Sequence, residues 1–194
     1  MNPNPFQQRV LAGAMILAPA LLLASTVIAV ADDAFAENVP SGVLLMFAMG
    51  AFFLAYLGVI GLVAEALPRL STVLLVTGAF GAMAGTAFGV VIIARAKGLE
   101  LQEGALEQAF NTPGILFPMT WLALGVCVLY SKVAPLWTGV ALALAGVGFP
   151  ISRIGGVGEV AIVADLLFLA ALCGLATVVV RAPATRTVPD PAVT

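Results

Sequence analysis

The chain has 194 residues, of which 62% are hydrophobic and only 9% are charged. A soluble domain is about one-quarter charged, so a surface this poor in charge is expected to face lipid rather than water. The net charge of −2 argues against a nucleic-acid-binding face, and the absence of histidine removes the commonest general base and transition-metal ligand.

Six apolar segments follow one another along the chain. They comprise residues 10–31, 41–67, 71–94, 114–130, 136–151 and 160–180. A helix needs roughly 20 apolar residues to cross the hydrocarbon core of a bilayer. The sequence therefore predicts an all-α, polytopic integral membrane protein with a six-helix transmembrane bundle in one domain, residues 1–181. The fifth segment is the shortest, so it has to thin the bilayer locally or extend into its flanks.

The first segment has some features of a secretory signal. Arg9 precedes it, and Ala34 to Ala36 read Ala-Phe-Ala, like a small-residue cleavage site. Its apolar run is longer than the roughly 7–15 residues of a signal peptide, so we expect a retained membrane span.

Lysine and arginine predict the orientation, because cytoplasmic loops carry an excess of both. With six spans and an inner N-terminus, the inner set is Arg9, Arg69, Lys132, Arg181 and Arg186, and the outer set is Arg95, Lys97 and Arg153. This bias places both termini in the cytoplasm of a plasma membrane. The proline-rich tail, residues 182–194, is too polar to pack and is expected to be extended.

Residues 98–112 form the longest polar connection. Leu99, Leu106 and Phe110 alternate there with glutamates, which predicts a short amphipathic helix on the outer membrane surface. A solvated connector resting on the bundle is the alternative, and we favour it over a moving lid.

The third segment carries glycines at a helical spacing. Gly78 precedes Gly81, Gly85 and Gly89, which form a double G-x-x-x-G, or glycine-zipper, pattern. Such small-residue faces let membrane helices approach closely. The partner is another helix of the bundle by default, and another chain is the alternative.

A weak internal repeat relates two helical hairpins. Residues 57–81 align with residues 124–148, with Pro68 opposite Pro135 and Gly81 opposite Gly148. Each copy predicts a helix, a tight turn containing proline and a second helix in the same orientation. The alignment therefore predicts a parallel repeat of hairpins.

Charged residues near the last segment form a candidate outer polar cluster, namely Arg95, Arg153, Glu159 and Asp165. Asp165 lies about six residues beyond Glu159 and therefore roughly 9 Å deeper at 1.5 Å per residue. A carboxylate at that depth is expected to face the bundle interior and to have a partner. Arg153 is the first candidate and Arg95 the second.

Two roles remain open for this cluster. The favoured one is a structural clasp that ties together the ends of the third, fifth and sixth predicted helices. The alternative is a ligand or proton site in an outer-facing pocket, with Phe117 and Trp121 as its apolar wall.

Residues 114–181 carry a family resemblance. A helix ends in a short basic turn, which is followed by proline, Trp137, Gly139 and the run Leu-Ala-Leu-Ala-Gly-Val-Gly. This half resembles bacterial six-helix membrane proteins grouped as domain of unknown function 4386. The resemblance implies a six-helix membrane fold and no catalytic activity.

No catalytic residue, cofactor or metal site is predicted. Cys127 and Cys173 lie inside apolar runs without C-x-x-C spacing, and neither a nucleophile elbow nor clustered membrane acids occur. The expected function is that of a non-enzymatic accessory, assembly or regulatory subunit. Its expected partners are the lipid bilayer and other membrane subunits or further copies of itself. A small transporter or binder of an apolar solute or lipid around Asp165 is the alternative.

Overall fold

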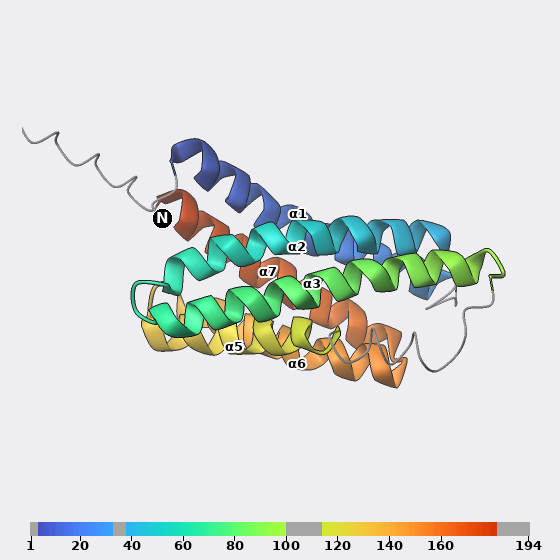
Figure 1. Cartoon of the computed structure of the whole chain (residues 1–194). Helices are drawn as coiled ribbons and strands as arrows, with labels where there is room; N and C mark the ends of the chain where they lie inside the picture. The colour runs from blue at the N-terminus through green and yellow to red at the C-terminus, as the bar shows by residue number, and fades with distance from the viewer. Residues whose placement is uncertain (1–3, 33–37, 100–113, 182–194) are drawn as a thin grey trace, which may run out of the picture.

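The computed structural model describes residues 4–32, 38–99 and 114–181. These residues form six helices and no strand: α1 Pro5–Ala31, α2 Val39–Val63, α3 Pro68–Ala96, α5 Leu116–Ser131, α6 Leu136–Gly155 and α7 Gly158–Arg181 (Figure 1). Five of the helices, all except α5, are long and apolar enough to cross a membrane. The predicted all-α bundle is therefore confirmed. The amphipathic segment from residue 100 onward, the possible cleavage site and the tail lie outside the described residues.

Helix lengths differ from the prediction in the second half of the chain. α6 runs through Pro150 to Gly155 and has 20 residues, whereas α5 has only 16. At 1.5 Å per residue α5 is about 24 Å long, which is less than the roughly 30 Å of a bilayer core. The sequence misled here because the glycine-rich run after Ile151, residues 152–158, resembles a turn, and Pro150 lies just before it. The helix continues since a missing N–H is tolerated within a packed membrane bundle.

Local signals explain where several helices begin and end. The Asn4 side chain accepts from Gln7 N and the Gln7 side chain accepts from Asn4 N, which is a capping box at the start of α1. Asn38 caps α2 in a similar way by accepting from Ser41 N. Gly156, with φ of 65°, ends α6 in the left-handed conformation that favours glycine.

The helices form a closed arrangement. Each helix packs against its neighbours along the chain, α7 returns to α1, and α2 also contacts α5 and α7. The start of α1, the end of α7 and the turns after α2 and α5 lie at one end of the bundle (Figure 1). The end of α1, the start of α2, the end of α3 and the turn between α6 and α7 lie at the opposite end (Figure 1). The first of these is called the basic end below, because Arg9, Arg69, Lys132 and Arg181 belong to it.

The two predicted hairpins occur as α2–α3 and α5–α6. Pro68 is the first residue of α3, and Pro135 immediately precedes α6. Both turns lie at the basic end (Figure 1), so the hairpins run in the same direction. The second copy is shorter because α5 begins beside the middle of α3. The amide nitrogen of Phe117 would be 2.4 Å from a Cβ placed on Gly81.

The glycine face of α3 packs inside the bundle. A Cβ on Gly78 would lie 3.1 Å from the ring of Tyr56, and one on Gly85 would lie 2.6 Å from Met49 Sδ. A Cβ on Gly89 would meet the carbonyl of Gly42 at 2.9 Å. Together with the contact of Gly81, these positions bring α3 close to α2 and α5, as expected for small residues in a membrane bundle.

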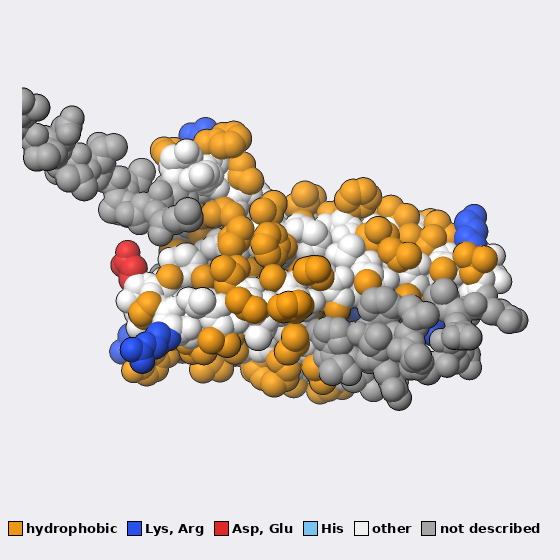
Figure 2. All heavy atoms as spheres, in the orientation of Figure 1, with side chains coloured by type: hydrophobic (Ala, Val, Ile, Leu, Met, Phe, Trp, Pro, Cys, Tyr) orange, Lys and Arg blue, Asp and Glu red, His pale blue; other side chains and the backbone are white. Residues whose placement is uncertain are grey.

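Hydrophobic side chains cover the flank of the bundle seen in Figure 2, whereas lysine and arginine side chains lie toward the two ends and the visible acidic side chain lies at the basic end. A soluble surface would intersperse charges over that flank. The distribution indicates that the flank contacts the lipid bilayer.

Candidate functional site

Three helices contribute to a buried polar cluster near the end opposite the basic end. Thr26 comes from α1, Arg153 from α6 and Asp165 from α7. Arg153 Nη2 lies 3.3 Å from Asp165 Oδ2, and it donates to Thr26 Oγ1 at 2.5 Å. Thr26 Oγ1 in turn donates to the same carboxylate oxygen at 2.5 Å. These three side chains are called the clasp below.

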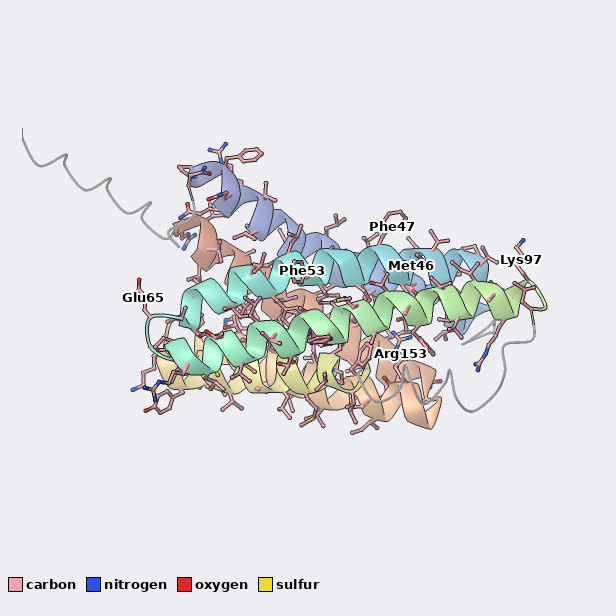
Figure 3. The ribbon with its side chains drawn as sticks, viewed as in Figure 1. Met46, Phe47, Phe53, Glu65, Lys97 and Arg153 are labelled. Carbon is pink, nitrogen blue, oxygen red and sulfur yellow. The ribbon has the colours of Figure 1, made fainter. Side chains whose placement is uncertain are left out.

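The helices bury the clasp unevenly. Asp165 and Thr26 are 0% exposed, whereas the Arg153 side chain is 21% exposed. Asp165 lies seven residues beyond the start of α7, about 10 Å along the helix, on the face that also buries Ala161 and Phe168. Arg153 lies in the last turn of α6, so its long side chain reaches inward from near the end of the bundle. Figure 3 shows Arg153 within the bundle, whereas Glu65 and Lys97 extend from its two ends.

The donors and acceptors in the clasp follow from the number of protons that each group carries. A threonine hydroxyl has one proton, and Thr26 Oγ1 lies 3.0 Å from Leu22 O as well as near Asp165. Because Arg153 donates to the Thr26 oxygen, the hydroxyl proton can be directed to the carboxylate. The guanidinium also lies 5.3 Å from the centroid of the Phe149 ring, which favours the cation. The arrangement therefore stabilises a charged pair away from water.

One carboxylate oxygen has no partner of its own. Among the described residues, Asp165 Oδ1 and Trp121 Nε1 are buried polar atoms without a hydrogen bond. A buried polar atom left unsatisfied costs about 1–3 kcal/mol. Asp165 Oδ1 could therefore accept a hydrogen bond from a small donor, and this is the chemical capacity that the clasp leaves open.

An aromatic cluster fills the bundle interior beside the clasp. Its members are Phe52, Tyr56, Phe117, Trp121, Phe149 and Phe168. Tyr56 stacks on Trp121 with 4.2 Å between ring centroids, and its hydroxyl donates to Phe117 O at 3.2 Å. Phe168 lies three residues after Asp165 and therefore continues the same face of α7. Phe117 and Trp121, the predicted pocket wall, are buried in this cluster.

The clasp joins two of the three expected helices, α6 and α7, but its third helix is α1 rather than α3. In the part of the chain described, the partners of Asp165 are Arg153 and Thr26. Arg95 is half-buried in the last turn of α3, and Glu159 is exposed in the first turn of α7. α7 packs against α1, α6 and α2 but not against α3 within the described ranges, so α1 takes the place expected for α3.

Thr26 is the residue that the sequence reasoning missed. Ser25 and Thr26 are adjacent polar residues within the otherwise apolar first segment, and this signal could have drawn attention to α1. Ser25 Oγ donates to Ser41 O at 2.8 Å, so the same pair also joins α1 to α2. Hydroxyl side chains commonly connect membrane helices in this way.

A groove lies on the outer side of the bundle between α2 and α3. It has a volume of about 270 Å³ and is lined by Met49, Gly50, Phe53, Ala79, Ala82, Met83 and Thr86. The Thr86 hydroxyl donates to Ala82 O, so the lining presents almost no polar group. These seven residues are called the α2–α3 groove below.

No group of three or more metal-ligating side chains occurs among the residues that the structure describes. Cys127 is a free buried thiol and Cys173 a free, partly buried one. Compared with protein-family models, with curated proteins and with solved structures, the chain matches none of them. The resemblance to domain of unknown function 4386 therefore stays a prediction.

Proposed function

We propose that this protein is a non-enzymatic accessory, assembly or regulatory subunit of partner membrane proteins in a bacterial plasma membrane. We place the protein in the bilayer, with both termini in the cytoplasm. The observation that carries the proposal is the α2–α3 groove, an open apolar surface on the side of the bundle. The clasp and the aromatic cluster provide a second line of support.

The interior favours a structural role over transport. Asp165 is closed off by Arg153 and Thr26, and the ring of Phe168 follows it toward the middle of the bundle. A transport route requires polar groups or water that continue across the bilayer. Aromatic rings occupy that position instead, so the intramembrane charges serve mainly to join helices.

The α2–α3 groove suits a transmembrane helix of a partner protein. Gly50, Ala79 and Ala82 supply small side chains, and Phe53 and Met83 supply large ones. Membrane helices associate where small residues permit close approach of the backbones. A Cβ added to Gly50 would meet no atom within 4 Å, so the space above it is available to another chain.

Site-specific crosslinking in native membranes tests this proposal. A photoreactive side chain at Met83, in the groove, is expected to give one protein adduct of fixed mass. The same side chain at Val163, which is exposed on α7, is expected to give none. Adding Gly50→Leu should abolish the adduct, because the leucine fills the groove, whereas Gly13→Leu should not.

Gly13 is the matched control because it is also exposed on a helix with no atom within 4 Å of an added Cβ. Equal crosslinking from Met83 and Val163, or an adduct that persists in Gly50→Leu, would show that the groove is not a helix-binding surface.

A small transporter or binder of an apolar solute or lipid is the second candidate function. The unpartnered Asp165 Oδ1 favours it, because an added donor would satisfy a buried acceptor. Native mass spectrometry of the protein extracted with its lipids distinguishes the two. A small molecule bound to the wild-type chain and lost in Asp165→Asn supports the binder, and its absence from both supports the subunit.

A further inference from the structure

The turn between α5 and α6 has an unusual backbone. Lys132 has φ of 53° and ψ of 27°, and it is the non-glycine residue with positive φ in the described ranges. Its N–H donates to Val128 O and ends α5. Glycine or asparagine is the usual residue in this left-handed position. Lys132 therefore combines a less favourable backbone conformation with a cation in the turn.

Amphipathic aromatic side chains flank that cation. Tyr130 is 75% exposed on the last turn of α5, and Trp137 is 52% exposed on the first turn of α6. Trp137 is also held in place, since its ring would lie 2.7 Å from a Cβ on Gly174 of α7. Tyrosine and tryptophan prefer the headgroup level of a membrane. Their positions place Lys132 at that level.

A second cation, Arg69, lies beside the corresponding turn of the other hairpin, between α2 and α3. Arg69 is exposed in the first turn of α3, which begins at the same end. Figure 2 shows lysine and arginine side chains gathered at the end where α3 begins and α5 ends. Glu65 extends from this end in a different direction in Figure 3. The local charge is therefore positive beside an aromatic rim.

We propose that Lys132 and Arg69, with Tyr130 and Trp137 beside them, bind the phosphate group of an anionic phospholipid. Lysine supplies a compact positive charge, and arginine supplies a planar donor pair that suits phosphate oxygens. The predicted orientation places this end in the cytoplasmic leaflet, which carries the anionic lipids. This site is independent of the α2–α3 groove and of the clasp.

Reconstitution in nanodiscs tests the proposal. We compare phosphatidylcholine discs with discs that also contain phosphatidylglycerol, and measure both the melting temperature and the phosphatidylglycerol retained in native mass spectrometry. Phosphatidylglycerol should stabilise the wild-type chain. Each cation removed is expected to lower its apparent affinity about fivefold, and Lys132→Asn with Arg69→Gln together about thirtyfold. Asparagine is chosen because it tolerates the left-handed backbone.

Lys97→Asn is the matched control, since Lys97 is an exposed lysine that ends α3 at the opposite end of the bundle. It should retain the wild-type affinity for phosphatidylglycerol. Lys132→Gly should fold at least as well as the wild type in phosphatidylcholine, because glycine relieves the turn, and should still lose lipid affinity.

Three results would overturn the proposal. The first is an equal loss in Lys97→Asn, which would indicate general charge attraction. The second is an unchanged affinity in the double variant. The third is equal stabilisation by inorganic phosphate in phosphatidylcholine discs, which would indicate a site for free phosphate rather than for a lipid headgroup.

Discussion

Asp165 remains inside the bundle because Arg153 and Thr26 both reach its Oδ2 atom. An unpaired charge at this depth would cost several kcal/mol, whereas a paired and hydrogen-bonded one costs much less. The clasp also connects the first helix of the chain to the last two. A hydrogen bond from Thr26 Oγ1 to Asp165 Oδ2 therefore joins two residues that lie 139 positions apart in the chain.

Removing one charge of the clasp should be worse than removing both. We expect Asp165→Leu to lower the free energy of unfolding by on the order of 3 kcal/mol, because Arg153 is left largely buried without its counter-charge. Arg153→Met combined with Asp165→Leu should recover most of that loss. Denaturation in bicelles measures both values. Glu159→Gln, an exposed carboxylate on the same helix, is the control and should change little.

A result in which Asp165→Leu alone unfolds like the wild type would show that the clasp does not hold α1 to α7. If the double variant stays as unstable as the single one, the loss comes from packing rather than from an unpaired charge.

At the level of the helix, α3 depends on glycines whose missing side chains make room for neighbours. Gly81 admits the backbone of Phe117 and so fixes where α5 begins. Because backbone atoms cannot rotate away as a flexible side chain does, this contact leaves no room for a methyl group. The short length of α5 and the close approach of α3 are thus parts of the same arrangement.

Two glycine-to-alanine substitutions should have opposite signs. Gly81→Ala is expected to lower the free energy of unfolding by about 1–3 kcal/mol through overpacking against Phe117. Gly50→Ala has open space around its Cβ and should raise stability by up to about 1 kcal/mol, because alanine favours the helix. Thermal unfolding of the two variants side by side gives the comparison. If both variants are destabilised, the loss does not come from the contact between Gly81 and Phe117.

Across the whole molecule, the turns after α2 and α5 lie at one end and the last turn of α3 lies at the other (Figure 1). If the chain crosses the bilayer six times, as the sequence predicts, α5 has to form the fourth crossing with only 16 residues. Its apolar composition would permit such a crossing where the bilayer thins locally.

Cysteine labelling tests the arrangement. In a chain with Cys127→Ala and Cys173→Ala, a cysteine replacing Lys132 should react with a membrane-impermeant maleimide only from the cytoplasmic side. One replacing Lys97 should react only from the outer side, because α5 separates the two positions. Labelling of both from the same side would mean that α5 does not cross the membrane.

Much of this architecture was accessible from the sequence. The six apolar segments and the proline turns of the repeat predict helices and hairpins because hydrophobicity and backbone restriction act locally. The end of α6 shows where local reasoning fails. The glycine-rich run after Ile151 suggests a turn, but α6 continues to Gly155 within the packed bundle.

At the candidate site, too, some residues of the clasp could be predicted from the sequence and one could not. The depth of Asp165 and its need for a partner could be predicted from composition, and Arg153 followed from its proximity in sequence. Thr26 could not, because its role depends on α1 packing against α7 at the far end of the chain. The expectation that Arg95 would be the second candidate partner depended on its predicted position on the outer side, and not on how α3 packs.

The sequence by itself determined that this chain is a lipid-facing bundle of helices, since burial in a bilayer is a sum over residues that can be read along the chain. Only the tertiary structure decided which helix meets α7, where α5 begins and where the α2–α3 groove lies. These three features depend on side-chain shape and on close approach between residues distant in sequence. Hydrophobicity summed along a stretch of the chain does not predict them.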